Sequence, residues 1–128
     1  FAKKVNGLVC GTENKSENLL GYYTRFGDEA SDFEPIMHLY KTQVYDLARY
    51  LSLPAPIINK PPTAGLWEDQ TDESELGFTY QEADPVLYLY FDENKNSEEI
   101  EKMGFPNAGK ILEFAKRNSY KHHTPYKI

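Results

Sequence analysis

A three-residue apolar run, Leu8-Val9-Cys10, constrains the fold of this chain more than any other feature. It is bounded by Gly7 and Gly11, and a short apolar run between turn-forming residues predicts a buried strand. Such strands usually need neighbours on both sides. The run therefore favours an α/β fold in which this strand belongs to a parallel sheet.

The residues after this run predict a turn and a helix. Gly11 and Thr12 make the turn, Asn14 is a suitable N-cap, and Glu17 stands where a capping box requires an acid, with the helix reaching about Tyr23. Helix N-termini at the carboxyl ends of strands attract phosphates, so Thr12 would lie at a nucleotide site. The alternative is purely structural: Thr12 and Asn14 satisfy helix donors and Glu17 only completes the cap. Local pattern alone favours this alternative.

Composition limits the class of protein. A chain of 128 residues can bury one modest core, and its first residue, Phe1, indicates a processed product or a piece of a longer chain. The net charge of -6 argues against a nucleic-acid surface, and no apolar run is long enough for a membrane span. The single cysteine, Cys10, excludes an internal disulfide. We expect a soluble, cytoplasmic protein.

Helical periodicity recurs along the rest of the chain. It predicts an amphipathic helix over about 41–51, ended by Pro54 and Pro56, and an irregular connection over 60–65. The acidic segment Trp67 to Glu75 shows no period and predicts an exposed loop.

Three further helices are expected. The first runs from a cap at Thr79 to about Tyr90, and Pro85 bends it. The second is capped by Ser97 and runs through Met103. The third is capped by Asn107. That last helix covers about 108–118 and places Ile111, Leu112 and Ala115 on one face, and the tail 119–125 is expected to be extended.

Several motifs are close to known sites but lack an essential residue. The segment 104–111 has P-loop spacing, yet Ile111 replaces the hydroxyl that would hold Mg²⁺. The segment that begins at Asp92 lacks the glycine and the final glutamate of a calcium loop. His122 and His123 are adjacent and have no further ligand at metal-binding spacing.

Three separated segments together resemble ammonia-dependent NAD synthetase. They are 11–17 with 21–28, then 39–43, and then 60–66 with 72–77, and their order and spacing match as well. The resemblance covers essentially residues 1–128 and corresponds to the carboxyl-terminal half of a single synthetase domain. It implies a partial doubly wound parallel α/β sheet of the PP-loop ATP pyrophosphatase (adenine nucleotide hydrolase-like) type, in which this portion is mostly helical with one short parallel strand.

The resemblance also implies an activity and a set of site residues. The enzyme would be a homodimeric ligase that adenylates deamido-NAD with ATP and Mg²⁺ and then adds ammonia to give NAD. Lys41 would stabilise the leaving pyrophosphate, and Glu17 would bind Mg²⁺. The ATP-binding residues would be Thr12, Lys41 and Thr63, and the deamido-NAD-binding residues would be Arg25, Asp32, Tyr120 and Lys121. The segment Trp67 to Glu75 would order over the bound substrates.

This sequence departs from the family at three places. Arg25 stands where lysine is usual, and Tyr120 stands where many members have histidine. The family's Ser-Gly-Gly-x-Asp-Ser pyrophosphate loop is not among these residues, so we predict that the 128 residues alone have no synthetase activity. Two alternatives remain open: a non-catalytic dimerisation module, and another amidating or thiolating enzyme of the same ATP pyrophosphatase group.

Overall fold

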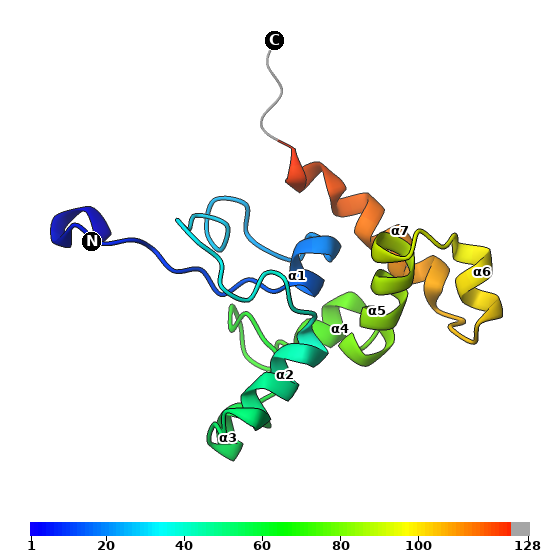
Figure 1. Ribbon diagram of the computed structural model, residues 1–128, viewed down its shortest axis with the longest axis horizontal. Helices are drawn as coiled ribbons and strands as arrows, with labels where there is room; N and C mark the ends of the chain where they lie inside the picture. Colours follow the sequence, from blue (N-terminus) through cyan, green and yellow to red (C-terminus); the bar gives the residue numbers. More distant parts are fainter. Residues whose placement is uncertain (124–128) are drawn as a thin grey trace, which may run out of the picture.

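The computed structural model describes residues 1–123 and is mostly helical. Figure 1 shows α1, α5 and α7 near one another, with α6 beside α7, while α2 and α3 project away from this group. None of the described helices has the length and apolar character needed to cross a membrane. The elements follow one another as η1 (Ala2–Val5), α1 (Lys15–Leu20), α2 (Lys41–Tyr50), α3 (Ala55–Ile58), α4 (Asp72–Leu76), α5 (Tyr80–Leu87), η2 (Tyr88–Asp92), α6 (Ser97–Lys102), α7 (Ala108–Asn118) and η3 (Ser119–His122).

The core lies where α1, α5, α6 and α7 meet. Leu20, Leu87, Ile100 and Ile111 are each fully buried there. In α7 the predicted apolar face is confirmed, because Ile111 and Ala115 are buried and Leu112 packs against the same cluster. Burial of apolar side chains is the main force that holds these helices together.

Local capping signals place several helices where the sequence predicts them. Asn14 accepts a hydrogen bond from the Glu17 N–H and Glu17 accepts one from the Asn14 N–H, which is the predicted capping box of α1. Thr79 and Glu82 form the same arrangement at α5. Helix α1 is shorter than predicted because Gly21 ends it in a left-handed conformation, with φ of 63°.

Other helices agree with the prediction apart from details at their ends. Helix α2 covers nearly the predicted range, and the chain over 60–65 is irregular as expected. Asn96, and not Ser97, caps α6, while Asn107 precedes α7 without a side-chain cap bond. Helix α5 contains Pro85, ends at Leu87 and continues into the π-helical turn η2.

The prediction that Leu8 to Cys10 form a buried strand is wrong, because these residues are exposed. The described residues contain no strand there. Leu8 is 72% exposed, and Cys10 forms one isolated parallel bridge with Phe33. The physical reason is that residues 1–123 offer no neighbouring strands to cover an apolar run. A short parallel strand is therefore not confirmed, although the single bridge is parallel.

Three segments have more structure than predicted. Ala55–Ile58 forms α3, since Pro54 and Pro56 lie at its N-terminus, where a missing N–H costs nothing. The predicted exposed loop contains α4, capped by Thr71, with Gln70 and Asp72 buried. Residues 119–122 form η3 in place of an extended tail, and the predicted tail residues Thr124 and Pro125 lie outside the described residues.

Candidate functional site

A polar cavity of about 300 Å³ lies where the N-terminal ends of α1 and α2 meet the segment before α4. We call it the Lys41 cavity. It brings together four of the predicted site residues, Thr12, Glu17, Lys41 and Thr63, which are up to 51 positions apart in the sequence. The remaining lining residues are Glu13, Tyr22, Tyr23, Asp28, Ala64 and Asp72.

An ion pair between Glu17 and Lys41 is the central contact of this cavity. The Lys41 Nζ atom lies 2.7 Å from Glu17 Oε1, and both side chains are largely buried. The second oxygen of Glu17 accepts the N–H of Asn14 at 3.2 Å, so helix capping fixes the carboxylate. Lys41 also lies over the ring of Tyr80, 5.3 Å from its centre, in a cation–π contact.

Glu13 is the most perturbed carboxyl group of the cavity. Its side chain is only 3% exposed; Asn18 donates a hydrogen bond to Oε1, while Oε2 is buried without a partner. The pKa of Glu13 is raised to about 7, mainly by burial; the Asn18 hydrogen bond opposes this shift, and the negative charges of Glu34 and Glu17 add to it. Glu13 therefore exchanges its proton near neutral pH.

Asp72 also lines the cavity, and it comes from the segment that was predicted to be a loop. Tyr80 donates a hydrogen bond to Asp72 Oδ2 at 3.2 Å, while Oδ1 is buried without a partner. Burial raises the pKa of Asp72, and the positive charge of Lys41 opposes that shift. The start of α4 is thus packed onto the cavity.

The donor set of the cavity fits a hard divalent cation. Four of its lining residues carry carboxyl groups, against the one ammonium of Lys41, and two carboxylate oxygens are buried without partners. Mg²⁺ in nucleotide sites takes one or two carboxylates together with phosphate oxygens and water. Among residues 1–123, no group of three or more acidic, histidine or cysteine side chains is arranged to hold a metal ion by itself.

Two of the predicted deamido-NAD residues, Arg25 and Lys121, line a second cavity of about 470 Å³, which we call the Lys121 cavity. The Lys121 Nζ atom donates to the carbonyl oxygens of Gly21 and Tyr23 at 2.7 and 2.8 Å. A smaller cavity of about 150 Å³ is lined by Lys121 and also by Tyr22, Tyr23 and Asp28 of the Lys41 cavity. The two larger cavities are therefore neighbours.

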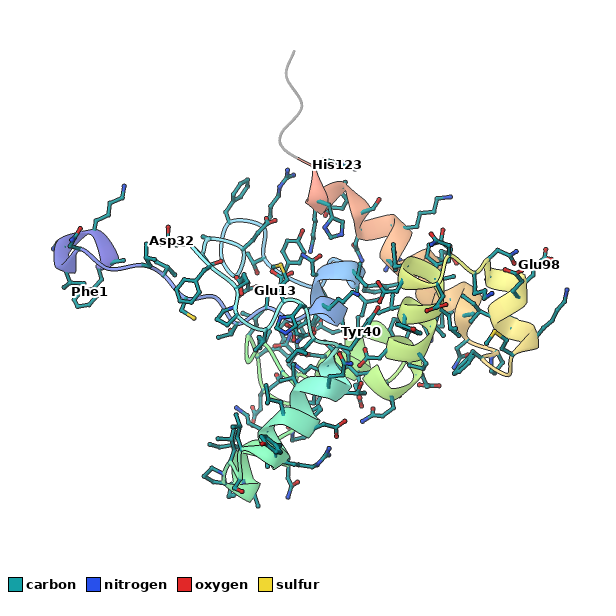
Figure 2. All side chains as sticks on the ribbon, in the orientation of Figure 1. Phe1, Glu13, Asp32, Tyr40, Glu98 and His123 are labelled. Carbon is teal, nitrogen blue, oxygen red and sulfur yellow. The ribbon has the colours of Figure 1, made fainter. Side chains whose placement is uncertain are left out.

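The other two predicted deamido-NAD residues line neither cavity. Asp32 Oδ2 accepts the N–H of Val9 at 2.7 Å, and Figure 2 shows Asp32 on the segment beside the extended N-terminal part, away from Tyr40. Tyr120 lies in η3 and is about half exposed. In this structure the four residues do not form one group.

Sequence reasoning missed several residues of the Lys41 cavity. Glu13 follows Thr12 directly, and Figure 2 shows it beside α1, but a lone acid in a turn gives no signal of its own. Asp72 had a weak signal, since Thr71 followed by three acids resembles a helix N-terminus. Tyr22 and Tyr23 were predicted only as the last residues of the first helix.

Two synthetases of known structure share this fold. An NMN synthetase from Francisella tularensis has a TM-score of 0.79 and 37% identity over 99% of this chain and 49% of its own. An NH3-dependent NAD synthetase from Campylobacter jejuni, in complex with nitrate, has a TM-score of 0.72 and 31% identity over 99% of this chain and 48% of its own.

The chain belongs to the NAD synthase family, whose model matches residues 1–125. Among curated relatives, the NH(3)-dependent NAD(+) synthetase of Thermoplasma volcanium is 45% identical over the whole chain and 50% of its own length. That of Fusobacterium nucleatum is 48% identical over 98% of this chain and 49% of its own. The chain thus spans about half the length of the curated relatives it matches.

Proposed function

We propose that this chain is part of a ligase that uses ATP and ammonia to convert deamido-NAD to NAD, releasing AMP and pyrophosphate. Membership of the NAD synthase family supports the reaction class. The observation that carries the site assignment is the Glu17–Lys41 ion pair in a cavity that Thr12 and Thr63 also line. In the complete protein, residues 1–128 would form the carboxyl-terminal part of one synthetase domain with a doubly wound parallel sheet. The pyrophosphate loop would come from the amino-terminal part.

Four residues of the Lys41 cavity have roles in this proposal. Glu17 would hold Mg²⁺, which supplies positive charge to the ATP phosphates when bound. Thr12 and Thr63 would donate hydrogen bonds to ATP. Lys41 would stabilise the negative charge that develops on the leaving pyrophosphate. The Lys41 ammonium, which pairs with Glu17 at 2.7 Å, would thus lie beside the group that holds the metal.

The Lys121 cavity would receive the deamido-NAD substrate. Arg25 offers a planar fork of donors that suits a phosphate or a carboxylate, and Lys121 adds a second positive charge. Asp32 and Tyr120 would complete the contacts after rearranging from their present positions. We further propose that the protein is a homodimer in the cytoplasm.

The test of this function uses the complete protein and compares two acids in equivalent capping positions. Glu17→Gln should reduce the rate of NAD formation by about 10²-fold or more and weaken the dependence on Mg²⁺, because the metal ligand is lost. Glu82→Gln alters the corresponding capping box of α5, and Glu82 lines no described cavity. This variant should leave the rate of NAD formation and its dependence on Mg²⁺ nearly unchanged. Unchanged activity and metal dependence in Glu17→Gln would contradict the assigned role. The isolated 128 residues should form no NAD.

A second substrate is favoured by one observation, the likeness to an NMN synthetase. Such an enzyme would amidate the smaller nicotinate mononucleotide with the same ATP chemistry. The complete protein should therefore be assayed with both acids, and the ratio of the two kcat/KM values decides between them. We expect deamido-NAD to be preferred. A higher value for nicotinate mononucleotide would assign the protein to the second activity.

A further inference from the structure

Helix α2 carries Lys41 at its first position but has no capping residue of its own. The first N–H groups of an α-helix lack partners within the helix, and Ser, Thr, Asp or Asn usually precedes them. Here Tyr40 occupies that place, and the bond that Gln43 Oε1 accepts, at 2.9 Å, comes from the Tyr40 N–H. The N–H groups of Lys41 and Thr42 must therefore be satisfied by other parts of the chain.

Two buried side chains from different helices supply those partners. The Lys41 N–H donates to Ser16 Oγ of α1 at 2.8 Å, and the Thr42 N–H donates to Asp84 Oδ2 of α5 at 2.8 Å. Ser16 Oγ in turn donates to Asp84 Oδ1 at 2.5 Å. Ser16 is fully buried and Asp84 is 4% exposed. We call these three hydrogen bonds the Asp84 clasp.

The clasp is built on a carboxylate. Both oxygens of Asp84 accept from donors, and one of these donors is a backbone N–H that cannot be reversed. An amide at this position could still accept the Thr42 N–H and could donate to Ser16 Oγ if that hydroxyl rotated, but both bonds would lose the negative charge that strengthens them. The negative charge also lies at the positive end of α2, where it stabilises the helix.

The same bonds determine where the two charged site residues lie. Ser16 is the neighbour of Glu17 in α1, and Lys41 and Thr42 begin α2. The clasp therefore ties the N-terminal ends of α1 and α2 to one buried group, next to the 2.7 Å contact between Glu17 and Lys41. Asp84 is not among the residues that line the Lys41 cavity. Any effect that it has on chemistry must pass through other residues.

We propose that Asp84 is a positioning residue: through Ser16 and the first turn of α2 it holds Lys41 in register with Glu17 for pyrophosphate departure. This inference rests on the proposed function. It differs from a purely stabilising role because it requires that the effect of Asp84 on the rate depend on Lys41.

Amide hydrogen exchange in the complete protein tests the clasp without reference to activity. The N–H groups of Lys41 and Thr42 should be protected in the wild type, although they begin a helix. Asp84→Asn should accelerate exchange of the Thr42 N–H by about 10-fold or more, because this donor loses its charged acceptor. The Glu82 N–H, capped by Thr79, should not change. Equal rates for both α2 amides in variant and wild type would overturn the clasp.

A double-mutant comparison tests the positioning role. Asp84→Asn should lower kcat by about 10²-fold, the effect expected of a small misplacement, with KM for ATP nearly constant. In a Lys41→Met background the same change should have little further effect, because the group that it positions is absent. Thr79→Ala, which weakens a cap of α5 outside the clasp, should lower thermal stability but leave kcat unchanged. An equal loss of kcat from Asp84→Asn in both backgrounds would overturn the proposal.

If Asp84→Asn does not fold, a milder variant provides the same test. Ser16→Ala removes the acceptor of the Lys41 N–H and the Ser16–Asp84 bond but keeps the bond from the Thr42 N–H to Asp84. It should accelerate exchange of the Lys41 amide more than that of the Thr42 amide, with a smaller loss of kcat. An unchanged Lys41 amide or kcat in Ser16→Ala would overturn the proposal. A wild-type protein that forms neither NAD nor NMN would overturn the proposed function and, with it, the positioning role of Asp84. The exchange data would then still report on the clasp.

Discussion

Two regions of this molecule are held together in different ways. Helices α1, α5, α6 and α7 surround a cluster of fully buried apolar side chains such as Leu20 and Ile111. The segment before α1 and the pair α2–α3 instead expose large apolar residues, among them Leu8 at 72% and Leu51 at 58%. Polar contacts, such as the Asp84 clasp and the Glu17–Lys41 pair, connect α2 to the first region.

The comparison shows that the candidate site lies on the boundary between these regions. One wall of the Lys41 cavity, formed by α1 and the start of α4, belongs to the packed region, and Lys41 itself comes from the projecting helix α2. Apolar packing is not directional, whereas hydrogen bonds and ion pairs fix distances and angles. At this boundary, hydrogen bonds and ion pairs therefore fix the positions of the site side chains tightly enough for chemistry. Apolar burial contributes little to holding them there.

The largest effect on stability is expected in the packed region. Ile111→Ala should lower the free energy of unfolding by about 2–5 kcal/mol, because it removes a fully buried side chain and leaves a cavity. Urea unfolding of the complete protein measures this cost, with Leu112→Ala on the half-buried side of α7 as a milder control. A loss below about 1 kcal/mol for Ile111→Ala would mean that the packed region does not depend on this core.

A smaller, pH-dependent effect is expected at the boundary. Burial raises the pKa of Glu13 from 4.5 to about 7, so the folded state binds the proton more tightly than the unfolded state. The resulting stability is fully present below pH 4.5 and is lost as the pH rises through 7. Glu13→Gln, which is neutral throughout, should therefore stabilise the protein by up to about 3 kcal/mol at pH 8 and by little near pH 4.5.

Glu82→Gln provides a control of opposite sign for this pH series. Hydrogen bonds from the Thr79 N–H and hydroxyl lower the pKa of Glu82, so its contribution is present at neutral pH and is lost on acidification. Unfolding curves from pH 4 to 8 should show the two variants diverging from the wild type in opposite directions. A Glu13→Gln curve parallel to the wild type would contradict the buried, protonated carboxyl.

The smallest effect is expected in the projecting region. Leu51→Ser replaces a largely exposed side chain at the end of α2 and should change the free energy of unfolding by less than about 0.5 kcal/mol. The same denaturation experiment measures it. A cost above about 1 kcal/mol would break the comparison, because it would show that another surface covers this residue in solution.

Local signals predicted the elements that depend on neighbours in the sequence. The capping boxes at Asn14 and Thr79 each lie within four residues, so the sequence alone fixes where α1 and α5 begin. The apolar face of α7 was equally clear from its helical period. The strand expected at Leu8 to Cys10 failed because burial of an apolar run is decided by partners elsewhere in space, and local sequence does not reveal whether they are present.

The candidate site was only partly predictable. The turn-helix pattern pointed to Thr12, and family resemblance identified Glu17, Lys41 and Thr63. Nothing in their spacing predicted that the four would line one cavity. Asp84 was missed because it acts through tertiary contacts. Its one visible signal is an acid between the buried residues Ala83 and Val86 of α5, at a place where a solvated charge would be unfavourable.

The clasp at the start of α2 also bears on the order in which the protein folds. Its bonds join residues 25, 42 and 68 positions apart, whereas a capping box closes over three. A ten-residue helix without its own cap is too short to persist in water, so a peptide of residues 41–50 should be a disordered coil. We therefore expect the first turn of α2 to form only after α1 and α5 have docked, which makes Lys41 one of the last residues to reach its native position.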